Sequence, residues 1–272
     1  ARSFFIPVES EIVLANGIVK EKDSSLIEDM IVGTLEGSYL SKSNFAALDL
    51  IRNNNWERPI YFVGTNQTDE LGLSDYVQLD GIAYQLVPIK TITGSDFERG
   101  RIDTDLLYEN LMTKFSYRSI NDKQVYLDHF HRRTLSVVRL RFQFMRLAAA
   151  LAKENDFIRA EEVLDRIVEL TPDENVPYDM FMPGIAEVYY QIGKAEKGTT
   201  ILNSMVEISG DYLNYYMNFK PKQKENISNE INYYLRVIGN IYQMARQYNQ
   251  PELAQRAEEL FAIYSPEISY KR

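Results

Sequence analysis

Asp128, His129 and His131 are side chains of the kind that bind metal ions or transfer protons, and they lie in one short segment. The segment is predicted to be helical, and residues two apart on a helix point about 200° away from each other, so the histidines cannot share a ligand. Asp128 could still pair with His131, but no third group is visible, and a reactive site needs convergent geometry. Capping and surface hydrogen bonds are the favoured interpretation.

Motifs for other reactions are missing from the sequence. It has no glycine-rich phosphate loop, nucleophile elbow or paired-histidine zinc motif. It has no cysteine, which excludes disulfides and cysteine nucleophiles. Adjacent carboxylates such as Glu161-Glu162 and Glu258-Glu259 diverge on a helix, so they do not predict a glycosidase pair. We therefore assign no catalytic residue or metal site and expect no cofactor.

Arg132, Arg139 and Arg146 recur at seven-residue intervals along a predicted helix, with Arg133 and Arg141 nearby. Guanidinium groups bind phosphate with paired hydrogen bonds, so this basic stripe is a candidate site for the phosphate of a lipid-linked sugar. Charged runs on helices are more often solvated or paired with a neighbouring helix. We favour that structural interpretation.

Trp56, Glu57 and Arg58 lie at a predicted helix-to-strand turn, where proteins often place function. Trp56 could stack on a sugar with Glu57 binding its hydroxyls. Alternatively, Trp56 covers the end of a sheet and Arg58 pairs with an acidic neighbour. The structural alternative is favoured, since tryptophan's large apolar area usually drives burial.

Tyr212, Tyr215, Tyr216 and Phe219 share one face of a predicted helix. This face either packs on the following helix, which we favour, or forms a recognition surface, because aromatic rings are frequent anchors at interfaces.

The composition restricts the class of protein. The chain has 272 residues, 45% of them hydrophobic, which suffices for one large domain or two ordinary ones. A net charge of −9 argues against nucleic acid as a partner. No apolar run approaches the ~20 residues of a membrane helix. Because the chain begins at Ala1 without a leader sequence, we expect an excised or processed part of a longer membrane-anchored protein.

The predicted fold class is α+β, with a small α/β platform domain over residues 1–125 and an all-α repeat domain over residues 126–272. In the first domain, a helix is expected at 41–52, capped by Ser41 or Ser43, and another at 104–114. Strands are expected at 12–14, 31–32, 58–64 and 82–87.

The second domain follows a helical period. Phe130, Val137, Phe144 and Leu151 recur every seven residues, which predicts a helix of roughly 25 residues. Small residues then repeat at twelve-residue intervals, namely Ala148, Ala160 and Pro172, and 38 positions later Ala186, Gly198 and Gly210. In this pattern small residues let paired helices approach, and proline or glycine ends the unit. It is typical of tetratricopeptide helix pairs. A degraded, possibly capping third unit runs from Ala254 to Pro266.

Five stretches, in order, resemble a family of bacterial multispanning membrane proteins. They begin at Asn55-Trp-Glu-Arg-Pro, Gln78-Leu-Asp-Gly, Thr104-Asp-Leu-Leu, Val125-Tyr-Leu-Asp and Pro172-Asp-Glu-Asn-Val-Pro, and lie within about residues 40–215. Members resemble C-type glycosyltransferases in their membrane half, and animal relatives are protein O-mannosyltransferases. The resemblance implies a carboxy-terminal region at the periplasmic face of the inner membrane. The acidic residue expected to drive transfer belongs to the membrane half, so none is carried over.

Three functions remain open. The first is a non-catalytic accessory region that positions a protein acceptor or the membrane half of the same polypeptide, with a lipid-linked sugar as a further candidate partner. The second is a small hydrolytic α/β enzyme with polar residues near Trp56 and Asp80. The third is a protein-interaction module unrelated to glycosylation.

Overall fold

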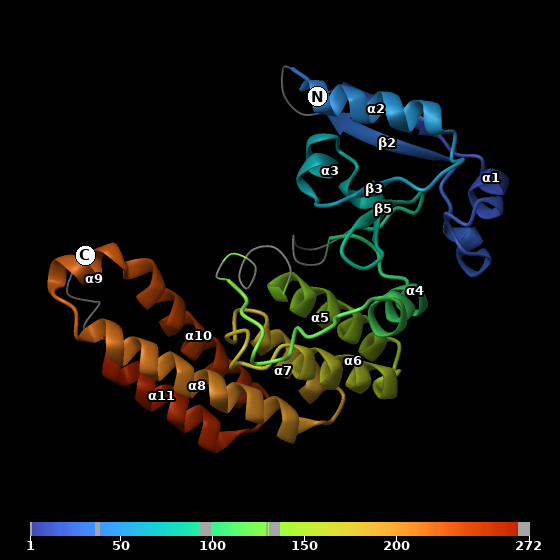
Figure 1. Ribbon diagram of the computed structural model, residues 1–272. Coiled ribbons are helices and arrows are strands. Elements are labelled where there is room, and N and C mark those ends of the chain that lie inside the picture. Colours follow the sequence, from blue (N-terminus) through green and yellow to red (C-terminus); the bar gives the residue numbers. More distant parts are fainter. Residues whose placement is uncertain (1, 36–38, 93–98, 129, 131–136, 266–272) are drawn as a thin grey trace. The chain divides into compact units, whose positions relative to one another are not determined.

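The computed structural model describes residues 2–35, 39–92, 99–128, 130 and 137–265 (Figure 1). The chain divides into two compact units, Ala1–Ser116 and Tyr117–Arg272. Small antiparallel sheets lie in the first unit, and the second is built from helices, as the predicted order of a mixed region before a helical one requires. The domain boundary at residue 125 stays a prediction.

The first sheet pairs β1 (Arg2–Pro7) antiparallel to β2 (Met30–Leu35), with Phe5 opposite Val32. Side chains alternate between the two faces, so Ile31 is buried whereas Phe5 and Val32 are exposed. The ring of Phe4 lies directly over Gly33, and a Cβ there would collide with it.

Helix α2 (Lys42–Asn54) begins where the sequence predicts, because the hydroxyl of Ser41 accepts a hydrogen bond from the Asn44 N–H. It ends at Asn55, which adopts a left-handed conformation. Ile51 is buried, whereas Phe45, three helical positions after the Lys42 start, is 68% exposed and takes no part in the core.

The strand expected at 12–14 is wrong, since these residues lie in helix α1 (Ser10–Ala15). A run of three apolar residues fits either structure. Here Val13 alone among the three is fully buried, and the left-handed Gly17 ends the helix after little more than one turn.

The second sheet has the order β3 (Tyr61–Phe62), β5 (Tyr84–Leu86), β4 (Val77–Leu79), all antiparallel. Its strands are shorter than the expected 58–64 and 82–87. Around it lie α3 (Asn66–Glu70), the 3₁₀ turns η1 (Glu21–Leu26) and η2 (Ser74–Tyr76), and α4 (Thr104–Tyr108), which continues as a π-helical turn η4 (Glu109–Lys114). Leu107 and Leu111 are buried, as expected for the helix predicted at 104–114.

The second unit stacks helices in antiparallel pairs. They are α5 (Val137–Lys153) with α6 (Phe157–Leu170), α7 (Met182–Gln191) with α8 (Ala195–Met217), and α10 (Ser228–Gln247) with α11 (Pro251–Tyr264), and the short α9 (Pro221–Asn226) precedes α10. Each hairpin turn contains one left-handed residue, namely Asn155, Gly193 or Asn249. These residues reverse the chain within a few positions.

The predicted small residues lie where helices touch. Ala148, Ala160, Ala186 and Ala254 are buried, and a Cβ on Gly198 would lie 2.8 Å from the carbonyl oxygen of Ala186. The expectation that Gly210 ends its unit is wrong. It lies inside α8, where a Cβ would meet Leu260 of α11 at 3.3 Å. Packing against α11 thus overrides the intrinsic cost of a mid-helix glycine.

The second and third hairpins are also joined by polar and aromatic contacts. The Tyr190 ring of α7 stacks on Tyr248 at a centroid distance of 4.6 Å. The hydroxyl of Thr199 donates to Oε1 of Gln250 at 3.1 Å and contacts the Tyr190 hydroxyl at 2.9 Å.

The long helix expected from residue 126 begins later. Residues 126–128 are irregular and Phe130 is exposed, whereas Phe144 and Leu151 are buried in α5 as predicted. Within the described residues, none of the helices is both long and apolar enough to cross a membrane.

Candidate functional site

The end of α8 carries an aromatic surface. Tyr212, Tyr215 and Tyr216 of α8 and the following Phe219 meet Tyr233 and Tyr234 of α10, and we call these six residues the tyrosine cluster. Tyr212 stacks on Tyr234 with ring centroids 4.7 Å apart and planes inclined by 12°. Tyr215 contacts Phe219 edge-on at 5.0 Å. The rings therefore hold one another in place.

The tyrosine cluster combines the two interpretations of its sequence pattern. Tyr212 packs on the next helix, as the favoured alternative requires, yet it is 40% exposed and Tyr215 is 59% exposed. Rigid, half-exposed tyrosines give a large contact area at low entropic cost on binding. Tyr233 and Tyr234 were not predicted, although a second tyrosine pair shortly after the first was a usable signal in the sequence.

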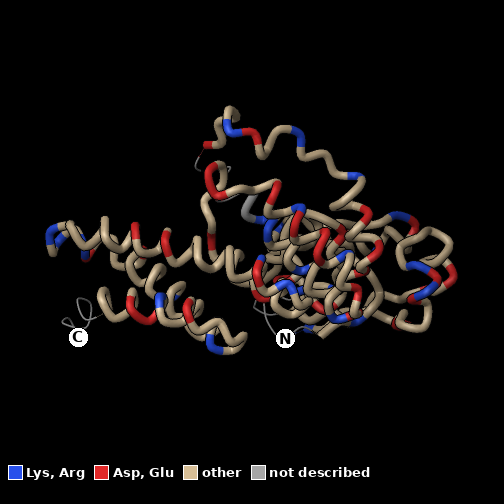
Figure 2. The backbone as a smooth tube through the Cα atoms, turned by 90° about the horizontal axis from the view of Figure 1, so that it is seen from below, with Lys and Arg blue, Asp and Glu red and all other residues tan. Residues whose placement is uncertain are grey.

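Basic side chains flank the tyrosine cluster. Lys220 and Lys222 are exposed at the start of α9, and the Nζ atom of Lys224 lies 3.5 Å from the sulfur of Met217. Elsewhere acidic and basic residues are interspersed along the chain, which is acidic in sum (Figure 2). The start of α9 is thus basic, although the exposed Asp211, Glu225 and Glu230 lie in the same stretch of chain.

The arginine stripe is not an exposed row in the described part of α5. Arg132 lies outside the described residues, Arg139 is exposed, and Arg146 is buried with its guanidinium 5.7 Å from the Phe142 ring centroid. Seven residues are slightly less than two full helical turns, so Arg139 and Arg146 lie near the same side of α5, but α6 and α7 pack on α5 and Arg146 is buried.

Arg141, noted only as a neighbour of that stripe, has the more specific environment. It is fully buried on α5 and points into the segment that links α6 to α7. Its guanidinium donates to the hydroxyl and carbonyl oxygens of Thr171, to the carbonyls of Val176 and Pro177, and to the carboxylate of Asp179, at 2.6–3.0 Å. These bonds occupy the whole guanidinium group, so Arg141 holds the linker and is not available to a ligand.

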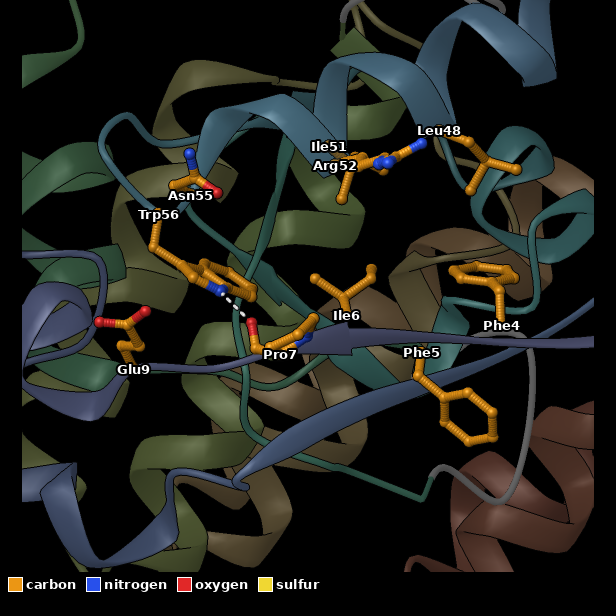
Figure 3. A pocket seen from close by; sticks show the side chains of 10 residues that line it. All are labelled: Phe4, Phe5, Ile6, Pro7, Glu9, Leu48, Ile51, Arg52, Asn55 and Trp56. Atoms are coloured by element: carbon orange, nitrogen blue, oxygen red, sulfur yellow. Dashed lines mark hydrogen bonds between the residues drawn. The ribbon is translucent and has the colours of Figure 1, made fainter.

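Trp56 is buried at the end of the first sheet. Its indole N–H donates to the Pro7 carbonyl at 2.9 Å, and the Trp56 carbonyl accepts from the Asn16 side chain at 3.0 Å. A hollow beside the indole has a volume of about 360 Å³ and is lined by side chains of β1 and α2 (Figure 3). Glu57 and Arg58 do not line it.

Asp80 is buried directly after β4, in the region considered for hydrolysis. Its two carboxylate oxygens accept from the Gln78 amide at 2.9 Å and from the Tyr61 hydroxyl at 3.3 Å. Burial raises the pKa of Asp80 above that of an ordinary carboxyl, although both hydrogen bonds act in the opposite direction. Asp80 is not among the lining residues of the hollow at Trp56.

Asp103 is a second buried carboxylate, and it caps α4 by accepting from the Leu106 N–H at 3.1 Å. It also forms ion pairs of 3.3 Å with Lys20 and Lys22. Burial acts to raise the pKa of Asp103, but the cap bond and the two lysine charges outweigh it, so the pKa is lowered. Both carboxylates are therefore engaged by neighbouring groups, which is typical of structural networks.

Asp128 forms a local cap of the expected kind, because its carboxylate accepts from the Phe130 N–H at 2.8 Å. His129 and His131 lie outside the described residues.

The described residues thus form a mixed unit followed by stacked helix hairpins that carry an aromatic surface. Residues 1–106 match the family model of TMEM260-associated domain 2. This match fits the expected resemblance to O-mannosyltransferase-related proteins over the N-terminal part of the chain. No curated protein and no solved structure gave a match.

Proposed function

We propose that this chain is a non-catalytic accessory region of a membrane glycosyltransferase-like protein, at the periplasmic face of the inner membrane, where it holds a protein acceptor or a partner subunit. The match to a TMEM260-associated domain supports the association with a glycosyltransferase. The observation that carries the binding role is the tyrosine cluster, whose rings are fixed by mutual stacking and still reach solvent.

The helix hairpins support a tetratricopeptide-like array. Buried alanines at 148, 160, 186 and 254 allow close helix contacts, and Gly198 lies against the main chain of α7. Arrays of this kind bury their core between neighbouring hairpins and use their surfaces to hold peptides or domains.

The partner segment is expected to be acidic and to carry apolar side chains. Exposed tyrosines supply anchors for apolar groups, and Lys220 and Lys222 beside them favour negative charge, which raises the rate of association. Arg146 is buried, so the proposal rests on the tyrosine cluster and makes no use of the arginine stripe for a lipid-linked sugar.

The test replaces Tyr212 and Tyr215 by alanine in the native gene and measures the glycosylation of acceptor proteins by mass spectrometry. Tyr212 also stacks on Tyr234 of α10, so circular dichroism and thermal unfolding must show that the variant is folded. We expect glycosylated acceptor peptides to fall about tenfold, as a loss of roughly 1.4 kcal/mol of binding implies. Arg139→Ala, an exposed change on another helix, is the matched control.

Asp80→Asn separates this proposal from the hydrolytic alternative. An accessory region transfers sugar normally with this change, since no reaction step uses the carboxylate. If glycosylation is abolished by Asp80→Asn while circular dichroism shows that the first unit is still folded, the region is an enzyme and the proposal is wrong. Unaltered glycosylation in the Tyr212→Ala, Tyr215→Ala variant also contradicts it.

A further inference from the structure

The main chain of β1 presents unpaired hydrogen-bonding groups along its outer edge. The Val8 N–H donates to the Asp29 carbonyl at 3.0 Å, which makes this pair hydrogen-bonded across the sheet. In an antiparallel ladder such pairs alternate with pairs whose N–H and C=O point outward. By the register of β1 on β2, the groups of Ser3, Phe5 and Pro7 point away from β2.

Two contacts agree with this assignment. The outward carbonyl of Pro7 accepts the Trp56 indole N–H. On the other strand, Val32 lies opposite Phe5, and its outward N–H reaches the hydroxyl of Tyr76 at 3.5 Å.

The described residues cover one edge of this sheet and leave the other open. On the β2 side, Gly72 packs directly against the main chain of Thr34, a contact that a side chain at this left-handed glycine would prevent. On the β1 side, no group of the described chain bonds to the main chain of Ser3 or Phe5. Natural sheets usually protect such an edge, because it is a template for another strand.

A hollow runs along the open edge. Phe4, Phe5, Ile6 and Pro7 all line it, together with residues of α2 such as Leu48 and Ile51 (Figure 3). Side chains of consecutive strand residues point to opposite faces, so four consecutive lining residues place the hollow along the strand edge and not on one face alone. Trp56 closes one end.

We propose that β1 binds an extended peptide segment of another protein by strand addition, with one apolar side chain of that peptide seated in the hollow between β1 and α2. The outward N–H and C=O groups of Phe5 and Ser3 require a partner with alternating main-chain donors and acceptors, which an extended polypeptide supplies. The apolar side chains of Ile6, Leu48, Ile51 and Trp56 receive the inserted side chain, and Glu9, Arg52 and Asn55 also line the hollow. This site lies in the first unit and does not depend on the tyrosine cluster.

The test uses the 272-residue chain and a displayed pool of random nonapeptides, selected on the wild-type protein and counted against Phe5→Pro. Proline removes the outward N–H of Phe5 and leaves the bonds of Ile6 and Val8 to β2, since proline is tolerated at the solvent side of an edge strand. Phe5→Ala is the matched control, because it removes the same exposed ring and keeps the N–H.

We expect enriched peptides with alternating apolar residues that bind Phe5→Ala within about threefold of wild type and Phe5→Pro at least tenfold more weakly. The Phe5 amide of the wild type should exchange its hydrogen at least tenfold more slowly with such a peptide bound. Native exchange protection of Val8 in Phe5→Pro verifies that the sheet is intact.

Three results overturn the proposal. One is a pool in which no peptide distinguishes wild type from Phe5→Pro. The second is slowed exchange in the tyrosine cluster in place of β1. The third is a dimer in analytical ultracentrifugation that Phe5→Pro dissociates, because β1 would then pair with a second copy of this chain. Loss of glycosylation in the Tyr212→Ala, Tyr215→Ala variant has no bearing on these readouts, so the two proposals fail separately.

Discussion

The indole N–H of Trp56 donates to the carbonyl of Pro7 at 2.9 Å and so joins the turn after α2 to the end of β1. Asn55 and Trp56 both adopt positive φ angles, 46° and 60°, which direct the indole back over the sheet. A bulky residue in this conformation costs about 1 kcal/mol or more and persists only where the surroundings enforce it. The hydrogen bond to Pro7 and the burial of the Trp56 ring hold the backbone in this conformation.

Trp56→Phe should therefore destabilise the first sheet. The ring face is largely retained, but the Pro7 carbonyl loses its donor, which costs about 1–2 kcal/mol. Amide exchange of Ile6 and Val8, which bond to β2, should accelerate about 5- to 30-fold. Exchange in α7 and α8 serves as the internal control, and unchanged exchange of Ile6 and Val8 would contradict a stabilising role for this hydrogen bond.

Arg141→Met should destabilise the helical unit by about 3–5 kcal/mol, because it leaves the buried carbonyls of Thr171 and Val176 without a donor and the Asp179 carboxylate without its ion pair. Arg141→Lys should recover little, since one ammonium cannot reproduce the planar array of donors. Urea unfolding followed by circular dichroism measures both.

Arg139→Met is the matched control, because Arg139 is exposed on the same helix. Its effect should stay within about 0.5 kcal/mol. Equal effects at positions 139 and 141 would be inconsistent with a linker held by Arg141.

Gly198→Ala should cost about 1–3 kcal/mol, because its Cβ would lie 2.8 Å from the main-chain oxygen of Ala186, which cannot move without shifting α7. Gly239→Ala in α10 is the matched control. Its Cβ meets nothing within 4 Å, so it should stabilise the helix by about 0.5–1 kcal/mol. Thermal unfolding of the two variants should thus shift in opposite directions, and shifts of the same sign would refute the close approach of α7 and α8.

Asp80 should make the first unit less stable as pH rises. Its pKa is raised in the folded protein, so the folded state holds the proton where the unfolded state has lost it. The contribution of Asp80 to the free energy of unfolding is greatest below its ordinary pKa of 3.8. It declines as the pH rises from that value through the raised pKa of the folded state. Asp80→Asn should remove this decline.

Fluorescence of Trp56, the single tryptophan, reports unfolding of the first unit in urea between pH 3 and 7. Asp103 contributes with the opposite sign, because its lowered pKa gives stability above its ordinary value that is lost in acid. Asp80→Asn keeps Asp103, so the difference between variant and wild type isolates Asp80. Parallel pH profiles would contradict the raised pKa.

The predictable parts of this molecule are those set by local sequence. The Ser41 cap and the burial of Phe144 and Leu151 follow from capping and helical period. Strand β1 was not predicted. Its side chains lie alternately on a covered and an open face of the sheet, and these two faces exist only after β1 has paired with β2. The partners of Arg141 are 30 or more residues away, and no local pattern specifies them.

The tyrosine cluster was likewise predicted only in the part that local spacing determines. Three tyrosines of α8 were found from their spacing, whereas Tyr234 joins them only through the packing of α10 on α8. Gly210 was predicted to end a helix because glycine is common at helix ends. The residue that it contacts, Leu260, lies 50 positions further along the chain, so the sequence near Gly210 does not indicate this contact.

The stack of Tyr190 on Tyr248, with Thr199 bonded to Gln250, makes the last two hairpins mutually dependent. These two hairpins therefore cannot be exchanged for other repeats in the way that the units of a regular solenoid can. Inserting a copied hairpin between residues 218 and 228 would separate these four side chains. A hairpin could therefore be inserted at this point only if the junction were replaced, whereas a hairpin added elsewhere would leave it intact.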